Sequence, residues 1–214
     1  MTLPELTPLE ARILGVLVEK EKTTPDTYPL TLNSLASGCN QKSSRDPVMN
    51  ARESEIQSAL EELRSRLLVL ETYGASGRVL RYAHNFGKCY GVPAGSVALL
   101  AALMLRGPQT ISELRANCER LYRFDDASSV EGYLEELSSR SSCALVLKLS
   151  KQPGEREHRW AHLLCGEAAV AAAETTTKRG ASDGSAFEAR IAQLEQEVAD
   201  LRAEVAQLAA RIAG

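Results

Sequence analysis

The chain has 214 residues, of which 44% are hydrophobic and 5% aromatic, and its formal net charge is −3. Its longest uninterrupted apolar run, residues 97–105, is much shorter than the roughly 18 residues that a membrane-spanning helix needs. The composition therefore argues against a membrane protein, and the length allows one or two domains with substantial cores.

Basic and acidic residues balance along most of the chain. Residues 1–88 hold 11 of each, residues 89–166 hold 9 of each, and residues 167–214 hold 5 basic and 8 acidic residues. A high-affinity nucleic-acid binder would show a basic excess. Five cysteines without a CxxC pair predict reduced thiols, and no signal peptide is visible, so we predict a cytoplasmic protein.

The first predicted helix begins at Thr7-Pro8-Leu9-Glu10, which combines a Thr N-cap, a Pro at the first helical position and a Glu three residues after the cap. An apolar stripe at helical spacing follows: Leu9, Ile13 and Leu17. Thr31 can cap a second helix. The polar loop that follows, residues 40–50, is longer than the turn of about 3 or 4 residues in a simple helix-turn-helix.

A third helix is predicted to begin at the capping pair Ser54 and Gln57. Two apolar-rich segments, residues 67–72 and 78–84, then flank a glycine-bearing turn, which predicts a β-hairpin. Three helices followed by a hairpin form the order of a winged helix.

The same order of three helices followed by a hairpin recurs further along the chain. A helix with Leu-Glu-Glu-Leu at residues 60–63 is repeated at residues 134–137, 74 positions on. New capping pairs are predicted at Thr110 with Glu113 and at Ser128 with Glu131, and a second hairpin at residues 144–149 and 159–164. Because residues 97–105 are apolar all round, we expect that helix to face the other module as well as its own.

These patterns predict a mainly α fold with small β-hairpins (α+β), arranged as tandem winged-helix domains with a C-terminal coiled-coil helix. We place the first winged-helix domain at residues 1–88, the second at 89–166, a flexible linker at 167–185 and the coiled coil at 186–214.

The predicted coiled coil has apolar residues that alternate spacings of 4 and 3, with branched residues at a and mainly Leu at d. This pattern favours a parallel homodimer, although antiparallel pairing or docking onto the chain's own body stays open because so short a coil is marginal alone. The predicted interface residues are Phe187, Ile191, Leu194, Val198, Leu201, Val205, Leu208 and Ile212.

Six motifs stand out along the chain: Leu6-Thr7-Pro8-Leu9-Glu10-Ala11-Arg12, Tyr28-Pro29-Leu30, Cys39-Asn40-Gln41-Lys42, Arg45-Asp46-Pro47-Val48-Met49-Asn50, Leu105-Arg106-Gly107-Pro108-Gln109-Thr110 and Lys151-Gln152-Pro153-Gly154-Glu155-Arg156-Glu157. Together they resemble the YceH-like family of uncharacterised bacterial proteins. The resemblance covers nearly the whole chain and implies tandem winged-helix domains without an established activity. Where the family pattern reads Asn-Leu-Ser-Glu-Ser-Glu, residues 50–55 differ and introduce Arg52.

No catalytic motif occurs, and three scattered histidines argue against an enzyme. We predict no catalytic residues, no metal site and no cofactor. Winged helices often bind duplex DNA through the third helix and the wing. The residues predicted to contact nucleic acid are Lys42, Ser43, Ser44, Arg45, Arg52, Arg78, Arg81, Arg156 and Arg159.

The third helix of each module is rich in glutamate, which disfavours deep insertion between DNA phosphates. Two alternatives stay open. The charged clusters can be ordinary solvated surfaces, with residues 40–52 bracing the first helix through Val48 and Met49. The chain can also be a protein-protein interaction adaptor that uses its winged-helix surfaces without binding nucleic acid.

Overall fold

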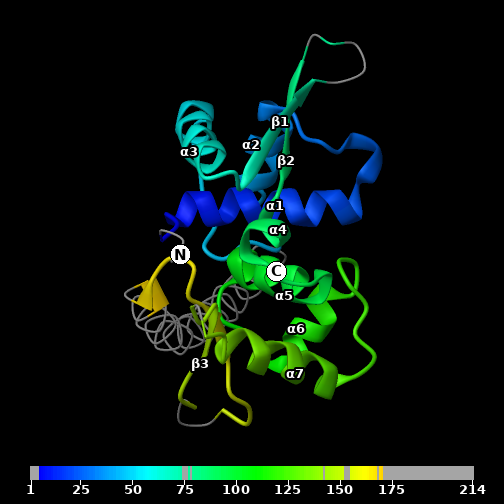
Figure 1. The fold of residues 1–214 in the computed structure, drawn as a ribbon, viewed down its shortest axis with the longest axis vertical. Coiled ribbons are helices and arrows are strands. Elements are labelled where there is room, and N and C mark those ends of the chain that lie inside the picture. The colour runs from blue at the N-terminus through cyan, green and yellow to red at the C-terminus, as the bar shows by residue number, and fades with distance from the viewer. Residues whose placement is uncertain are drawn as a thin grey trace, which may run out of the picture. The chain divides into compact units, whose positions relative to one another are not determined.

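The structure is a computed structural model that describes residues 5–170 apart from 74–76, 78, 142, 152–154 and 168. The described residues belong to one compact unit, Met1–Val170 (Figure 1). The predicted coiled coil, with all eight of its interface residues, lies outside the described residues.

Helices and two antiparallel hairpins make up the described part of the chain, which confirms a mainly helical α+β fold. Three longer helices and a hairpin occur twice in the same order. The elements are α1 (Pro8–Thr23), the 3-10 helix η1 (Pro25–Thr27), α2 (Leu32–Cys39), α3 (Glu53–Ser65), β1 (Val69–Tyr73), β2 (Leu80–His84), α4 (Phe86–Tyr90), α5 (Ala94–Arg106), α6 (Ile111–Cys118), α7 (Ala127–Ser138), β3 (Val146–Lys148) and β4 (Trp160–His162). We call α1 to β2 the first module and α5 to β4 the second module.

Three predicted helix starts are confirmed. Thr7 Oγ1 accepts a hydrogen bond from the Glu10 backbone N–H at 3.2 Å, and the Glu10 carboxylate accepts one from the Thr7 N–H at 2.7 Å. The same reciprocal pair joins Thr110 and Glu113 at α6, and Thr31 caps α2. These short-range bonds satisfy backbone donors that the helix itself leaves free.

The predicted starts of α3 and α7 are wrong by about one half turn. The N-cap of α7 is Asp126, whose carboxylate accepts the Ser129 N–H at 2.7 Å, because an ionised carboxylate is a strong acceptor at a helix N-terminus. Helix α3 begins at Glu53, so Ser54 lies inside it. Its first turn is fixed by Glu55, which accepts the Arg52 N–H at 2.7 Å.

A one-residue β-bridge joins the outer edge of each two-stranded hairpin. Leu30 exchanges backbone hydrogen bonds with Tyr82 on β2, at 3.1 and 2.8 Å. Gln109 exchanges the same pair of bonds with Trp160 on β4, at 3.0 and 2.8 Å. In both modules the bridging residue follows a proline and precedes the Thr N-cap of the second helix, so the internal repeat extends to the sheet.

The two modules meet where α1 packs against α5. Gly15 allows a close approach, since a Cβ there would lie 2.9 Å from Leu105 Cγ. Both helices are almost fully buried along this contact, and a single apolar core extends through both modules. The expectation that the apolar helix faces the other module is thus confirmed. Among the described helices, none has both the length and the apolar character to cross a membrane.

Candidate nucleic-acid interface

The segment between α2 and α3, residues 40–52, is a closed loop, which we call the α2–α3 loop. Asn40 joins its two ends: the Asn40 Nδ2 donates to the Ala51 carbonyl, and the Ala51 N–H donates to Asn40 Oδ1, both at 2.8 Å. A side chain that pairs in this way with a distant backbone fixes both ends of the loop.

Arg45 anchors the loop from inside. Its side chain is 0% exposed, and its guanidinium forms a bidentate ion pair with Glu19 of α1, at 2.6 and 3.1 Å. The Arg45 Nε also donates to the Gly38 carbonyl at 3.1 Å. Sequence reasoning assigned Arg45 to phosphate contact, but its donors are used inside the fold, and we now assign it a bracing role.

Two further contacts hold the α2–α3 loop against helices. Arg12 of α1 donates to the carbonyls of Cys39 at 3.1 Å and Pro47 at 2.7 Å, and burial lowers the pKa of its guanidinium. The Asp46 backbone N–H donates to the Leu105 carbonyl at the end of α5, at 2.8 Å. The loop therefore does brace α1. It does so through buried arginines, while Val48 is 57% exposed.

The outer side of the loop presents cations and hydroxyls to solvent. Lys42 and Ser43 are exposed, and Lys42 has no hydrogen bond or ion pair with any described residue. The Arg52 side chain is 79% exposed and pairs with Glu55 at 2.9 Å, a weak contact at such exposure. Ser44 is half-buried and has a left-handed backbone conformation, with φ of 59°. Lys42, Ser43 and Arg52 are thus available to a ligand.

The hairpins offer fewer cations than their sequences indicated. Arg81 of β2 turns inward to the Pro29 carbonyl at 2.8 Å. Arg159 pairs with Glu113 at 2.8 Å and with Glu155 at 3.2 Å. Arg156 is exposed, and Arg78 lies outside the described residues. Of the hairpin arginines named as candidate contacts, only Arg156 is seen to face solvent in the described part of the chain.

Uncharged polar residues and glutamates share the exposed surfaces of α3 and α7. The exposed residues Ser54 and Ser58 lie in the N-terminal half of α3, whereas Glu61 and Glu62 lie in its C-terminal half. On α7, Ser128 and Gly132 are likewise exposed and uncharged. Glu53 and Glu55 also lie in the first turn of α3, so its N-terminal half presents hydroxyl groups beside carboxylates.

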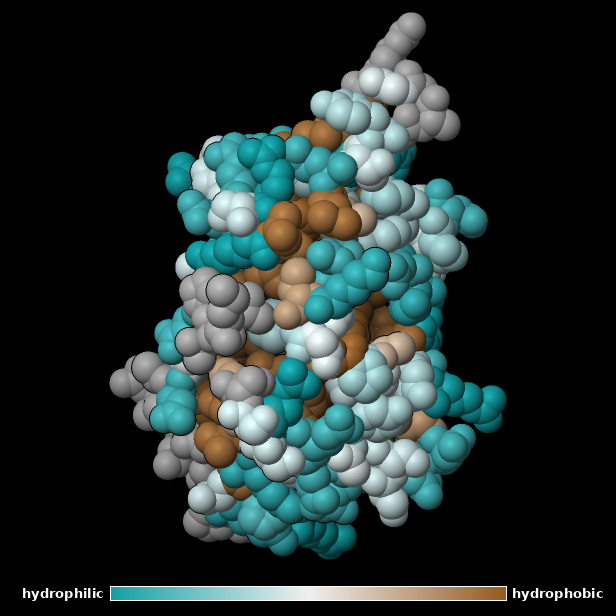
Figure 2. All heavy atoms as spheres, in the orientation of Figure 1, coloured by the Kyte–Doolittle hydropathy of each residue, from teal (hydrophilic) through white to brown (hydrophobic). Residues whose placement is uncertain are grey.

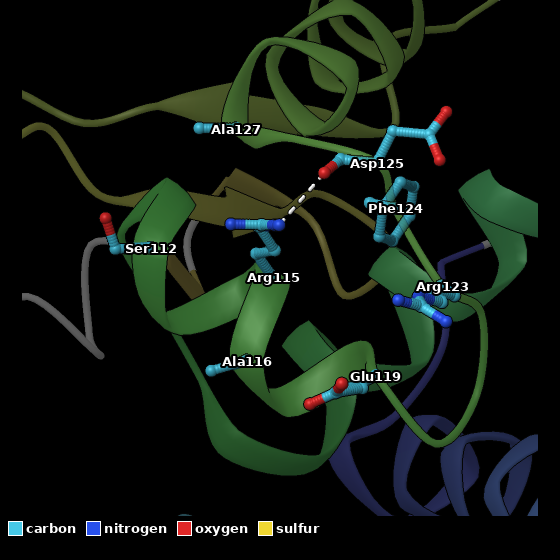
Figure 3. A pocket seen from close by; sticks show the side chains of 8 residues that line it. All are labelled: Ser112, Arg115, Ala116, Glu119, Arg123, Phe124, Asp125 and Ala127. Atoms are coloured by element: carbon cyan, nitrogen blue, oxygen red, sulfur yellow. Dashed lines mark hydrogen bonds between the residues drawn. The ribbon is translucent and has the colours of Figure 1, made fainter.

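A polar pocket of about 680 Å³ beside α6 was missed by sequence reasoning (Figure 3). Arg115 donates to the Asp125 carbonyl at 2.9 Å, and Arg123, Glu119 and the buried Phe124 complete one side. Arg115 in α6 and Arg123 in the turn before α7 were a usable signal in the sequence. Opposite charges line this pocket in equal measure, so it favours no anion by charge alone.

The described residues contain no group of three or more His, Cys, Asp or Glu side chains that could hold a metal ion. Two histidines belong to the second hairpin region. His158 Nδ1 lies 2.9 Å from the Leu149 carbonyl oxygen, and burial lowers the pKa of His162 to about 4.

Comparison with known proteins gives a consistent result. A family model described as "Protein of unknown function, DUF480" matches residues 6–155. A UPF0502 protein of Leptothrix cholodnii is 56% identical over 90% of this chain and 86% of its own length. UPF0502 proteins of Dechloromonas aromatica (54% identical, 91% of each chain) and of an Acidovorax species (56% identical, 90% and 87%) are similar over comparable lengths.

Proposed function

The chain belongs to the DUF480 family of bacterial proteins, the YceH-like family that its motifs resemble, and from this premise we propose that it is a non-enzymatic, tandem winged-helix protein that binds duplex DNA. The order of elements supports the winged-helix proposal. In each module a single residue between the first and second helices forms a β-bridge with the hairpin that follows the third helix. Such units commonly bind DNA through the third helix and the wing.

One observation carries the DNA proposal: the α2–α3 loop is held rigidly from inside while Lys42, Ser43 and Arg52 point to solvent next to α3. Arg45 and Arg12 fix the inner side of the loop through buried bonds. A preformed loop loses little conformational entropy when it binds, so a few phosphate contacts give more net affinity than they would on a mobile loop.

The exposed hydroxyl side chains in the N-terminal half of α3 support this arrangement. Ser54 and Ser58 are exposed there, and small hydroxyl side chains allow close approach to a sugar-phosphate backbone. Two carboxylates lie in the first turn of α3, Glu53 and Glu55, of which Glu55 pairs with Arg52 at the surface, while Glu61 and Glu62 lie further along the helix. We therefore propose that the loop and the start of α3 contact phosphates, without deep insertion of the whole helix.

Binding of a duplex DNA fragment at several salt concentrations tests the proposal. For Lys42→Ala/Arg52→Ala, we expect the slope of log affinity against log salt to become shallower by about 1.8, because each phosphate contact contributes about 0.9. The control, Lys22→Ala/Lys88→Ala, removes the same charge elsewhere and should retain the wild-type slope. The proposal would be contradicted if the protein does not bind DNA at low salt, or if the two double variants have equal slopes.

A second candidate function, a protein-interaction adaptor, is favoured by the first hairpin. Leu67, Leu70, Tyr73 and Val79 are between 45% and 68% exposed, and they are four of the six large apolar side chains that are exposed among the described residues. Figure 2 shows apolar surface between α3 and this hairpin. Capture of a protein from nuclease-treated extract by wild type, and its loss in Leu70→Ser/Tyr73→Ser, would favour the adaptor; equal capture by both would count against it.

We also propose that the chain forms a homodimer through residues 186–214, as the heptad pattern indicates. A dimer would present two copies of the α2–α3 loop, and weak contacts at both would add if the linker allows both to bind at once. Light scattering of the full chain measures this directly, and a monomeric mass would contradict it.

A further inference from the structure

A cavity of about 290 Å³ lies where the first and second modules meet, between the C-terminal end of α1, helix α4 and the start of α5. Its apolar wall comes from both modules: Val18 of α1, Val92 and Val97 near α5, and Leu121 after α6. Figure 2 shows apolar side chains in a recess between α1 and α5. Engineered cavities of about 150 Å³ bind benzene, so this space is large enough for two fused rings.

The polar edge of the cavity is formed by Glu21, Lys22, His84 and Lys88. Glu21 Oε2 lies 3.1 Å from Lys22 Nζ, so that pair is neutral overall. Lys88 is exposed and has no hydrogen bond or ion pair with any described residue. The edge therefore has one uncompensated positive charge, on Lys88.

His84 gives the edge a buried polar group with unused capacity. Its Nε2 lies 3.4 Å from the carboxylate of Glu21, and its Nδ1 is buried without a hydrogen-bond partner among the described residues. Burial lowers the pKa of His84, so the ring is neutral near pH 7 and has one N–H donor and one lone pair. A buried polar atom without a partner is costly, and a ligand that reaches it would relieve that cost.

We propose that this cavity binds a small monocarboxylate with an apolar body of about two fused rings. The apolar body packs between Val97 and Leu121, and the carboxylate lies beside Lys88 within reach of the His84 ring. One net positive charge matches a single carboxylate. A phosphate dianion would have to lose its hydration against the valines, and a cation would be repelled by Lys88.

Both modules line the cavity, so a bound carboxylate would stabilise their packing against each other. A ligand that binds only the folded chain raises its apparent stability, and the increase grows with the logarithm of the ligand concentration once the site is saturated. This proposal does not depend on DNA binding, and its test contains no nucleic acid.

Titration of 2-naphthoate into the full chain by calorimetry tests the proposal, with the neutral 2-naphthamide as an isosteric comparison. We expect the acid to bind about tenfold more tightly than the amide, because a charge-assisted hydrogen bond is stronger than a neutral one. Lys88→Gln should abolish that difference while leaving amide binding unchanged. The control, Lys151→Gln, removes an exposed lysine of the second hairpin region and should bind both compounds as wild type does.

Val97→Phe fills the apolar part of the cavity and should prevent binding of both compounds. If Val97→Phe does not fold, the Lys88→Gln variant still tests the proposal, because Lys88 is exposed and its replacement leaves the core intact. Three results would overturn the proposal: no binding of 2-naphthoate at millimolar concentration, equal affinities for acid and amide, or equal behaviour of Lys88→Gln and Lys151→Gln.

Discussion

Replacing Arg45 with alanine should lower the free energy of unfolding by about 3–5 kcal/mol, because it removes one partner of a buried ion pair. The Arg45 side chain is 0% exposed and its partner Glu19 is 19% exposed, so the remaining carboxylate would be left largely desolvated. The variant also removes the bond to the Gly38 carbonyl that holds the loop. Urea unfolding followed by far-ultraviolet circular dichroism measures the effect.

Arg52→Ala is the matched control from the same loop. Arg52 pairs with Glu55 at the surface, so its loss should change the free energy of unfolding far less than the loss of Arg45 does. The two variants separate bracing from ligand contact: Arg45→Ala should affect stability most, and Arg52→Ala should affect DNA binding most. Equal stabilities for the two variants would contradict the bracing role of Arg45.

The loss of stability caused by Arg45→Ala should become smaller at acidic pH. Burial by itself would raise the pKa of the Glu19 carboxyl. The hydrogen bond and the positive charge of Arg45 lower that pKa by more than burial raises it, so it lies below its ordinary value of 4.5. A carboxylate with a lowered pKa in the folded state stabilises the fold above its unfolded pKa, and this stabilisation is lost as the pH falls through the folded pKa. The difference between wild type and Arg45→Ala should therefore hold from pH 7 to about 4.5 and decrease below that.

Replacing Phe86 with alanine should lower the free energy of unfolding by about 3–5 kcal/mol, because the cavity left in a packed core cannot fully close. Phe86 begins α4, the link between the first hairpin and α5; it is 0% exposed, and its ring centroid lies 4.6 Å from that of Tyr90. Unfolding should be followed by circular dichroism and by the fluorescence of Trp160, the single tryptophan of the chain.

Because one core extends through both modules, the two probes should report the same shift, although Trp160 belongs to the second module. Tyr73→Ala is the matched control: Tyr73 is 68% exposed, so its removal should change stability by about 0.5 kcal/mol or less. Different midpoints for the two probes would show that the modules unfold separately and would contradict a shared core.

Much of the fold follows from local patterns in the sequence. The Thr7 and Thr110 capping boxes and the apolar faces of the helices act over three or four residues, and the structure has them. The errors were also local. The segment before α7 contains Asp126 as well as Ser128, and the stronger acceptor defines the cap. At α3 the start is set by Glu55, which lay just inside the predicted cap.

The candidate site was predicted less well, because its residues were chosen by charge. A count of cations cannot say whether each cation meets solvent or a carboxylate. Arg45 and Arg159 counted as phosphate ligands in the sequence, and in the structure both are occupied by glutamates. Lys42 has the same charge as they do and stays exposed. The mixed-charge pocket beside α6 was not predicted, because its positive and negative charges cancel when charges are counted along the sequence.

The sequence by itself determined the elements, their repetition and the apolar helix that joins the two modules, since these depend on spacings of a few residues. Only the tertiary structure decided which cations are available. Arg45 and Glu19 are 26 residues apart, and Arg159 and Glu113 are 46 apart, so no local pattern pairs them. The packing of α1 against the α2–α3 loop, and of α6 against the second hairpin, brings each pair together and leaves Lys42 and Arg52 to the solvent.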